Sequence, residues 1–329
     1  MNDGSTPQMS VVIATPDRYA TIRKTIKHLR AQTVSDRLEV VIVAPSAGAL
    51  DLDESELKDF HQFRVVEVGV ITSIAQANAA GVRQATAPVV VFAEDHAFPA
   101  PGWAEALIAA HRQPWAAVGP AIRNANPKSS VSWADLLIAY VPWLVPTEAG
   151  VIDHLPGHNS SYKRAILLDY GPDLEAMMQA ESVLHWDLRA KGHLLFLEPA
   201  ATISHTNFER LSSWIPAQFY SGRVFAAARA RHWSLIQRFL YAGSAPLIPV
   251  VRFLRIWGQL HRSSQQRSHP LGVLPILLLG LIVSAAGEMM GYAFGAGDAS
   301  RKLCSFEFAR EHLGKERQKK ESGINPSCR

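Results

Sequence analysis

Residues 88–96 read PVVVFAEDH, an apolar run that ends in two acidic residues and a histidine. Two similar runs come earlier in the chain, SVVIA at residues 10–14 and LEVVIVA at residues 38–44. Such largely apolar runs predict strands that are buried on both faces. Such strands are typical of a sheet that is covered by helices on either side.

The segments between these runs have a different periodicity. Residues 19–32 and 74–84 carry apolar residues at helical spacing, and residues 63–70 form a further apolar run. Strands that alternate with amphipathic helices predict an α/β fold with a mostly parallel sheet. Ligands bind such sheets beyond the carboxyl ends of the strands. The residues that follow each run are therefore the first candidates for a functional site.

The second half of the expected domain has a less regular pattern. Residues 103–111 predict a helix, and residues 133–144 are aromatic and apolar. Residues 194–196 and 201–203 predict two short strands. We expect these segments to form a more variable half that completes the site.

Composition narrows the function classes. The 329 residues are 48% hydrophobic and 19% charged, which indicates a globular chain with a surplus of apolar residues. The net charge is +4, and because basic residues concentrate after about Arg223, it favours an anionic membrane surface over a nucleic acid. The two cysteines, Cys304 and Cys328, and the polar residues 1–8, which lack a secretory pattern, predict a cytoplasmic location.

The apolar surplus lies near the C-terminus. Residues 235–257 are apolar but contain prolines and arginines, which is typical of a helix in the membrane interface. Residues 271–287 have about the minimum length of a bilayer helix, but they contain Pro275 and precede Glu288. We therefore expect a monotopic or re-entrant segment, followed by a basic tail that is disordered over residues 310–329.

Glu94, Asp95 and His96 form the strongest candidate site. Carboxylates and an imidazole at a strand end can hold a hard divalent cation, which in turn binds a diphosphate. The alternative is a solvated acidic turn. The segment PAPGW at residues 99–103 favours the site, because its prolines would fix the geometry of the loop.

With this context, the chain resembles the family 2 inverting glycosyltransferases, in which an acidic triplet of DxD type follows the same strand. The resemblance covers roughly residues 9–210. Its blocks occur in the family's order: SVVIATPDR, AQTVSDRLEVVIVAPS, SIAQANAAGVRQATAPVVVFAEDHAFPAPGW, GHNSSYKRAIL, AESVLHWDLRAKGH and LFLEPAATISH.

The resemblance implies a GT-A type fold, a nucleotide-sugar donor and a divalent metal, Mg²⁺ or Mn²⁺. It makes Glu94, His96 and His205 metal ligands and Glu181 the catalytic base. Inverting transfer needs a carboxylate that takes the proton of the acceptor hydroxyl, while the metal stabilises the departing diphosphate. The remaining implied residues are Thr15, Pro16, Asp17, Asn78, Arg83 and Asp95 on the donor side and Gly157, His158 and Asn159 on the acceptor side.

The resemblance also implies a division of the chain. Residues 1–212 become the catalytic domain, with a donor half over 9–120 and an acceptor half over 121–212. Residues 213–300 become membrane-associated helices, and residues 301–329 a basic tail. The acceptor is then a lipid-linked or cell-envelope glycan at the cytoplasmic face of the membrane, as in polysaccharide biosynthesis, and membrane lipids are the other partner.

The sequence departs from the family pattern in three places. The second strand leads into Ala44-Pro45-Ser46 instead of an acidic pair, the base position reads Glu181-Ser182 with one carboxylate, and the triplet ends in histidine. The last departure leaves the choice between Mg²⁺ and Mn²⁺ open.

Structural roles compete with several of these assignments. Asp17 would also suit the cap of the following helix, and His205 would suit a buried core position. Glu181 would suit a helix surface one turn before His185, and His158 and His185 would suit structural roles.

Two functions within or near this class stay open. One is transfer of the sugar to polyprenyl phosphate. The other is a nucleotide-sugar-binding or assembly protein with impaired catalysis, because expected carboxylates are absent. A dinucleotide-dependent oxidoreductase is disfavoured, since no GxGxxG follows the first strand.

Overall fold

The computed structural model describes residues 6–262 and 272–308, and within these ranges the strands form one nine-stranded sheet. The strand order is β3-β2-β1-β4-β8-β6-β9-β5, with β7 beside β9. The strands are β1 Met9–Ala14, β2 Leu38–Ala44, β3 Gln62–Glu67, β4 Val89–Ala93, β5 Ala97–Pro99, β6 Ala117–Asn124, β7 Gly150–Ile152, β8 Ser161–Lys163 and β9 Leu195–His205. Strands β1, β2, β3, β4, β6 and β9 share one direction, and the shorter β5, β7 and β8 oppose it. The predicted α/β fold with a mostly parallel sheet is confirmed.

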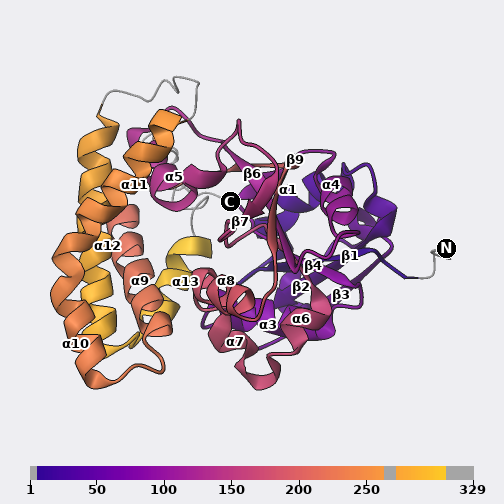
Figure 1. Cartoon of the computed structure of the whole chain (residues 1–329). Coiled ribbons are helices and arrows are strands. Elements are labelled where there is room, and N and C mark those ends of the chain that lie inside the picture. The colour runs from indigo at the N-terminus through magenta and orange to yellow at the C-terminus, as the bar shows by residue number, and fades with distance from the viewer. Residues whose placement is uncertain (1–5, 263–271, 309–329) are drawn as a thin grey trace, which may run out of the picture.

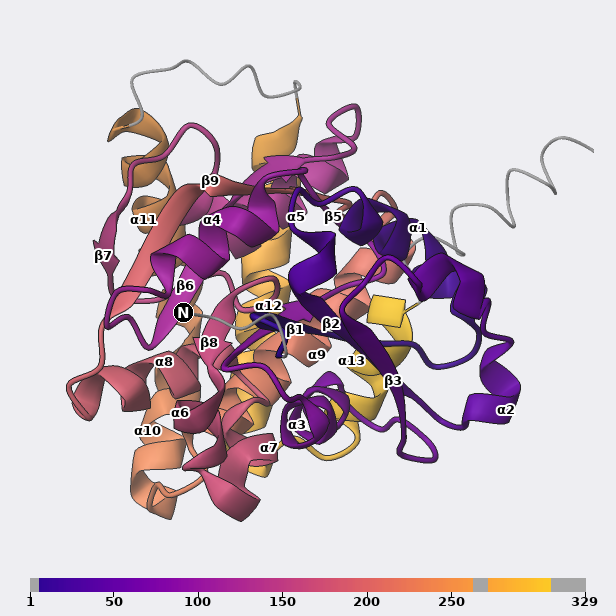
Figure 2. The same cartoon turned by 90° about the vertical axis from the view of Figure 1, so that its right-hand side faces the viewer.

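Helices cover both faces of this sheet (Figure 2). The α-helices are α1 Tyr19–Arg30, α2 Ala47–Leu50, α3 Ile74–Gln84, α4 Trp103–Ala110, α5 Ser130–Tyr140, α6 Arg164–Leu168, α7 Leu174–Met177, α8 Glu181–Ala190, α9 Leu211–Arg229, α10 Leu235–Ser244, α11 Ile248–Arg262, α12 Val273–Phe294 and α13 Ala299–Phe308. Short 3₁₀ helices are η1 Ser35–Arg37, η2 Glu54–Leu57, η3 Val141–Trp143, η4 Gly171–Asp173 and η5 Ala245–Leu247.

Alternation along the strands decides which helix each residue contacts. In β1, Val11 and Ile13 join the core beneath α1 and α4, whereas Val12 joins the core beneath α3, α6 and α8. Both faces of the strand are therefore buried, as its uninterrupted apolar sequence predicts.

The prediction of two separate short strands at residues 194–196 and 201–203 was wrong. They are the two ends of one strand, β9, whose register against β6 shifts between the pairs Pro120–Glu198 and Ala121–Thr202. Pro199 lies in this irregular stretch and has no N–H to donate to a neighbouring strand. The polar and proline-containing middle of the strand therefore looked like a break.

The C-terminal helices form a layer beside the sheet, with α10, α11 and α12 at its outer side (Figure 1). Residues 273–287 of the segment expected to be monotopic or re-entrant belong to the continuous helix α12, because Pro275 falls in its first turn, where no intrahelical N–H is needed. Residue 271 lies outside the described residues. Pro246 instead lies in η5, between α10 and α11. Helix α13 spans residue 301, where the predicted basic tail begins, and residues 310–329 lie outside the described part of the chain.

Glycines hold α12 against α9. A Cβ added at Gly287 would lie 2.0 Å from the Phe219 carbonyl oxygen, and one at Gly222 would lie 2.2 Å from the Ser284 carbonyl oxygen. Because these obstacles are backbone atoms, no side-chain rotation relieves them. The two helices therefore approach as closely as their backbones allow.

Replacing Gly287 by alanine is expected to destabilise the protein by about 1–3 kcal/mol, the usual cost of an overpacked interface. The measurement is thermal or chemical unfolding of the purified protein in detergent. Gly258→Ala is the matched control, because a Cβ at this α11 position meets nothing within 4 Å. Equal stability of the two variants would contradict the close helix packing.

Candidate functional site

The candidate site lies at the carboxyl edge of the sheet. Glu94 follows β4 directly, and His205 ends β9, two strands that run in the same direction. Strand β5, which follows the acidic triplet, pairs with the end of β9 so that Ala97 lies opposite His205. This pairing brings residues about 110 positions apart to one place on the sheet edge.

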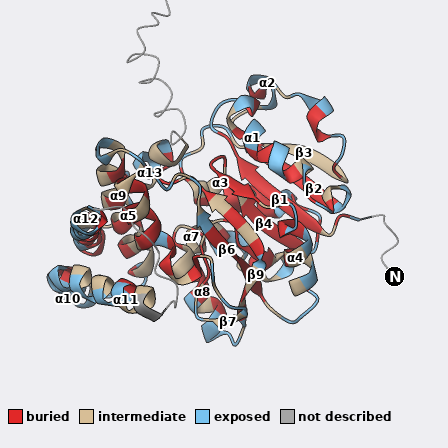
Figure 3. Ribbon diagram, turned by 90° about the horizontal axis from the view of Figure 1, so that it is seen from above, coloured by how far each residue is buried: buried red, intermediate tan, exposed pale blue. Residues whose placement is uncertain are grey.

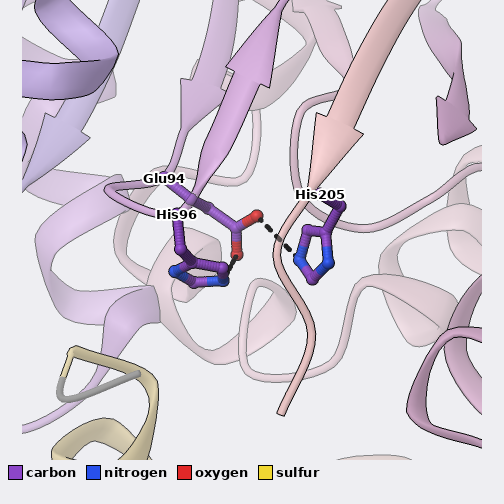
Figure 4. A group of neighbouring side chains, drawn as sticks. All are labelled: Glu94, His96 and His205. Carbon is purple, nitrogen blue, oxygen red and sulfur yellow. Dashed lines mark ion pairs between the residues drawn. The ribbon is translucent and has the colours of Figure 1, made fainter. Parts of the chain in front are cut away.

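Glu94, His96 and His205 converge on a common point (Figure 4). One ligand atom from each lies within 4.8 Å of the others. Nε2 of His96 is 3.6 Å from Glu94 Oε1, and Nε2 of His205 is 3.6 Å from Glu94 Oε2. Ligands of one Mg²⁺ or Mn²⁺ ion lie roughly 3–4 Å apart when each is about 2.1 Å from the ion. The cluster therefore has the atoms and spacing that a divalent cation needs.

Hydrogen bonds to the far nitrogens orient both imidazoles. Nδ1 of His96 lies 2.6 Å from Asp95 Oδ1, and Nδ1 of His205 lies 2.9 Å from Asn207 Oδ1. In the neutral form of each ring, Nδ1–H donates to these oxygens and the lone pair is on Nε2, the atom that faces Glu94. Carboxylates and carbonyls fix metal-binding histidines in this way.

Further contacts hold the cluster from the other side. Asn159 Nδ2 donates to Glu94 Oε2 at 2.9 Å, and the Tyr140 hydroxyl lies 3.2 Å from His205 Nε2. Asn159 has a positive φ of 65°, a conformation that asparagine tolerates better than most residues. The cluster is thus supported by the loop before β8 and by α5.

The charge of Glu94 is stabilised within the cluster. Its side chain is 11% exposed, and burial by itself would raise the pKa of its carboxyl group. The imidazoles of His158, His96 and His205 outweigh burial and hold this pKa well below its usual range. Glu94 is therefore a carboxylate at neutral pH, the form that binds a cation.

His158 links this cluster to Glu181. Its Nδ1 lies 3.5 Å from Glu94 Oε1, and its Nε2 lies 3.6 Å from Glu181 Oε1. Glu181 is the first residue of α8 and its side chain is 29% exposed. The candidate base is therefore one imidazole away from the candidate metal ligands. Sequence reasoning placed His158 beside the acceptor but did not foresee this bridge.

His185 has a structural position, one turn after Glu181. Its Nδ1 accepts the Leu155 N–H at 3.4 Å, and its Nε2 lies 2.8 Å from the Tyr162 hydroxyl. Burial lowers the pKa of His185 to about 3, so the ring is neutral. It fixes the segment that leads to Gly157 and His158 against α8.

The donor-side candidates divide into two groups. Asn78 lines a pocket together with Glu94, Asp95 and His96, whereas the Arg83 guanidinium donates to the Gly171 carbonyl oxygen at 3.2 Å. Arg83 is not among the residues that line this pocket, since it lies at the opposite end of α3. The pocket is lined by Ala14, Ile74, Asn78, Phe92, Ala93, Glu94, Asp95, His96, His158, Glu307 and Phe308.

Thr15, Pro16 and Asp17 follow the end of β1, next to Ala14 of the pocket. Asp17 Oδ1 accepts hydrogen bonds from the Arg18 N–H at 2.6 Å and the Thr21 hydroxyl at 2.7 Å. These bonds hold Asp17 beside the first turn of α1, but the N-cap residue is Arg18 and no side chain caps the helix.

Three residues at this edge were missed. Glu307 and Phe308 come from the end of α13, where no local sequence signal indicated a site residue. Glu67 ends β3 opposite Ala44 and accepts the Ala47 N–H at 2.5 Å. It places a carboxylate where the second strand lacks the expected acidic pair, and its position at a strand end was the signal that would have found it.

Comparisons with known proteins indicate a family and a fold. The sequence model described as glycosyl transferase family 2 matches residues 10–171. Comparison with curated proteins gave no match.

Among solved structures, the chain is similar to the mannosyltransferase PcManGT from Pyrobaculum calidifontis in complex with GDP-Man and Mn²⁺, with 16% identity and a TM-score of 0.51, over 86% of this chain and 87% of that chain. It is also similar to GalNAc-T7 with UDP, GalNAc and Mn²⁺, with 13% identity and a TM-score of 0.51, over 79% of this chain and 57% of that chain. At this level of identity the likeness shows a shared fold.

Proposed function

Because this chain belongs to glycosyl transferase family 2, we propose that it is a metal-dependent inverting enzyme that transfers a sugar from a nucleotide-diphosphate donor to a lipid-linked or cell-envelope glycan. One observation carries the proposal. Glu94, His96 and His205 meet at one point, and Glu181 lies across His158 from them. A base and a leaving-group site thus face each other at the same edge of the sheet.

The roles of the side chains follow from this arrangement. Glu94, His96 and His205 would hold a divalent cation, which supplies positive charge to the donor diphosphate. Glu181 takes the proton of the attacking hydroxyl group, as a general base does. Asn159 and Asp95 keep the ligands in place through their bonds to Glu94 and His96. A base on the acceptor side suits a single displacement, which inverts the anomeric centre.

The chemical class of the donor is proposed from the family and from the residues that line the pocket. The similar structures hold GDP-Man and Mn²⁺ in one case and UDP, GalNAc and Mn²⁺ in the other. For this chain we propose a nucleoside-diphosphate sugar, with Thr15, Pro16 and Asp17 near the nucleotide and Asn78 in the pocket. Because Mg²⁺ prefers oxygen ligands, the two imidazoles of this site favour Mn²⁺ over Mg²⁺.

The membrane side of the proposal rests on the C-terminal helices. Two helical stretches, residues 235–260 (α10, η5 and most of α11) and residues 273–294 (α12), are long and apolar enough to cross a bilayer by length and composition. We propose that they associate with the cytoplasmic face of the cell membrane. Helices α10 and α11 have many exposed residues (Figure 3), and several of these are large and apolar. These exposed residues are Leu235, Ile236, Phe239, Leu240, Leu247, Val250, Val251, Leu254 and Trp257.

The test of the metal site is a binding measurement. Donor binding to purified protein is expected to require Mn²⁺ or Mg²⁺, and Glu94→Ala or His205→Ala is expected to weaken it at least about 10-fold. Calorimetry with GDP and UDP sugars, with and without a chelator, measures this effect.

Glu54→Ala and His232→Ala are the matched controls, because both residues are exposed and neither lines the pocket. Donor affinity that chelation leaves unchanged would overturn the metal assignments together. Metal-dependent binding without any donor hydrolysis or transfer would instead favour the catalytically impaired binding protein.

A further inference from the structure

A second hollow lies at the carboxyl end of β6. It is an open groove of about 350 Å³, which is within the size range of small-ligand sites. Its walls come from the end of β6, from α5 and from the segment that follows η3. The lining residues are Ile122, Arg123, Asn124, Pro127, Trp133, Leu136, Leu144, Val145 and Pro146.

The groove has an apolar floor and one cationic side chain. Ile122, Leu136 and Leu144 are buried, and they form the floor, while Arg123 is exposed at the side. A guanidinium group recognises phosphate oxygens well, and an apolar floor favours a hydrocarbon chain. Together they suit a ligand with an anionic head and an apolar tail.

The groove adjoins the candidate metal site. Asn124 lines the groove, and its Oδ1 accepts from Asn207 Nδ2 at 3.1 Å. Asn207 Oδ1 is in turn 2.9 Å from His205 Nδ1. Strands β4 and β6 run in the same direction, so both sites open at the same edge of the sheet. The groove lies on the side of β4 away from β1, β2 and β3, which carry the donor-side candidates.

The groove also adjoins the helices that we propose to meet the membrane. One wall of the groove, residues 144–146, follows η3 directly, and η3 contacts α11. Helix α11 exposes Val250, Val251 and Leu254. A lipid held in the membrane by its tail would reach the groove from this side.

From these contacts we infer that the groove binds the acceptor, a polyprenyl diphosphate that carries a sugar, with the chain on the apolar floor and the diphosphate at Arg123. The inference rests on the proposed function. The acceptor hydroxyl oxygen forms a bond to the anomeric carbon of the donor, and the bond from that carbon to the donor diphosphate breaks. The nucleoside diphosphate leaves with the electron pair, and Glu181 receives the hydroxyl proton.

The experiment measures binding of farnesyl diphosphate in the presence of a chelator, so that diphosphate held by a metal makes no contribution. The full-length protein is expected to bind farnesyl diphosphate more tightly than inorganic diphosphate or farnesol. Arg123→Gln is expected to weaken binding about 10-fold, the effect of losing a charge-assisted hydrogen bond. Val145→Trp, which fills the groove, is expected to weaken it at least as much.

Matched controls are Arg112→Gln and Val151→Trp, at exposed positions outside the groove. Unchanged affinity for farnesyl diphosphate in both groove variants would overturn the inference. Equally tight binding of phosphatidate vesicles, weakened by the same two variants, would also overturn it, because it would indicate a general lipid site. Formation of a polyprenyl monophosphate sugar from polyprenyl phosphate would also overturn the assignment of a hydroxyl acceptor.

Metal-dependent donor hydrolysis without acceptor separates the two proposals. Arg123→Gln and Val145→Trp are expected to keep this hydrolysis. They are expected to raise the KM for the acceptor without changing the affinity for the donor. If wild-type protein neither bound nor hydrolysed a donor, the proposed function itself would fail, whatever the groove binds.

Discussion

Replacing Glu181 by glutamine is expected to lower kcat by about 10²- to 10⁴-fold, the usual contribution of a general base. Glutamine keeps the size of the side chain but cannot accept the proton of the acceptor hydroxyl. Donor affinity is expected to change little, because Glu181 lies across His158 from the metal ligands. The measurement pairs initial transfer rates with calorimetric binding of the donor.

Glu54→Gln is the control for Glu181→Gln, since it makes the same chemical change at an exposed position of η2. A Glu181→Gln enzyme with wild-type kcat would show that another group takes the proton. Loss of donor binding together with activity would indicate that Glu181 supports the metal site instead of acting as the base.

Gly157→Ala is expected to lower kcat by about 100-fold, which is the effect of moving a catalytic group by about 1 Å. A Cβ at Gly157 would lie 2.6 Å from Glu181 Cδ and 2.8 Å from Glu181 Oε2. The carboxyl group is the flexible end of its side chain, so it gives way more easily than the backbone. The substitution therefore displaces the base while the fold stays largely intact.

The measurement for Gly157→Ala is kcat for transfer beside the thermal unfolding midpoint. Gly150→Ala is the control, because a Cβ there meets nothing within 4 Å. A large loss of stability in Gly157→Ala, or unchanged kcat, would contradict the view that Gly157 leaves room for the Glu181 carboxylate.

Several elements were predicted within a residue or two because their local patterns are strong. Strand β2 and helix α3 have the predicted bounds, because the length and hydrophobic periodicity of a buried strand and of an amphipathic helix are distinctive in the sequence. The third strand ends at Glu67 instead of Val70, because Gly69 turns the chain with a φ of 67°. Sequence periodicity thus predicted where strands and helices lie more accurately than where they end.

The candidate metal cluster was predictable only in part. Glu94 and His96 stand together in the sequence at a strand end, which is a local signal. His205 was assigned to the same site only because of the resemblance to the family. In the structure, the pairing of β5 with β9 brings His205 near Glu94 and His96. The role of Arg83 stays a prediction: its helix has the predicted bounds, but its guanidinium contacts the Gly171 carbonyl oxygen and does not line the pocket.

Local chemistry in the chain thus specified the α/β class, most strands and helices, and the acidic triplet at a strand end, because burial and periodicity act over a few neighbouring residues. Tertiary packing decided the rest: the bridge of His158 between Glu94 and Glu181, the entry of Glu307 and Phe308 into the pocket, and the groove beside Arg123. These features join segments that lie far apart in the chain, and no local pattern encodes which distant side chains meet.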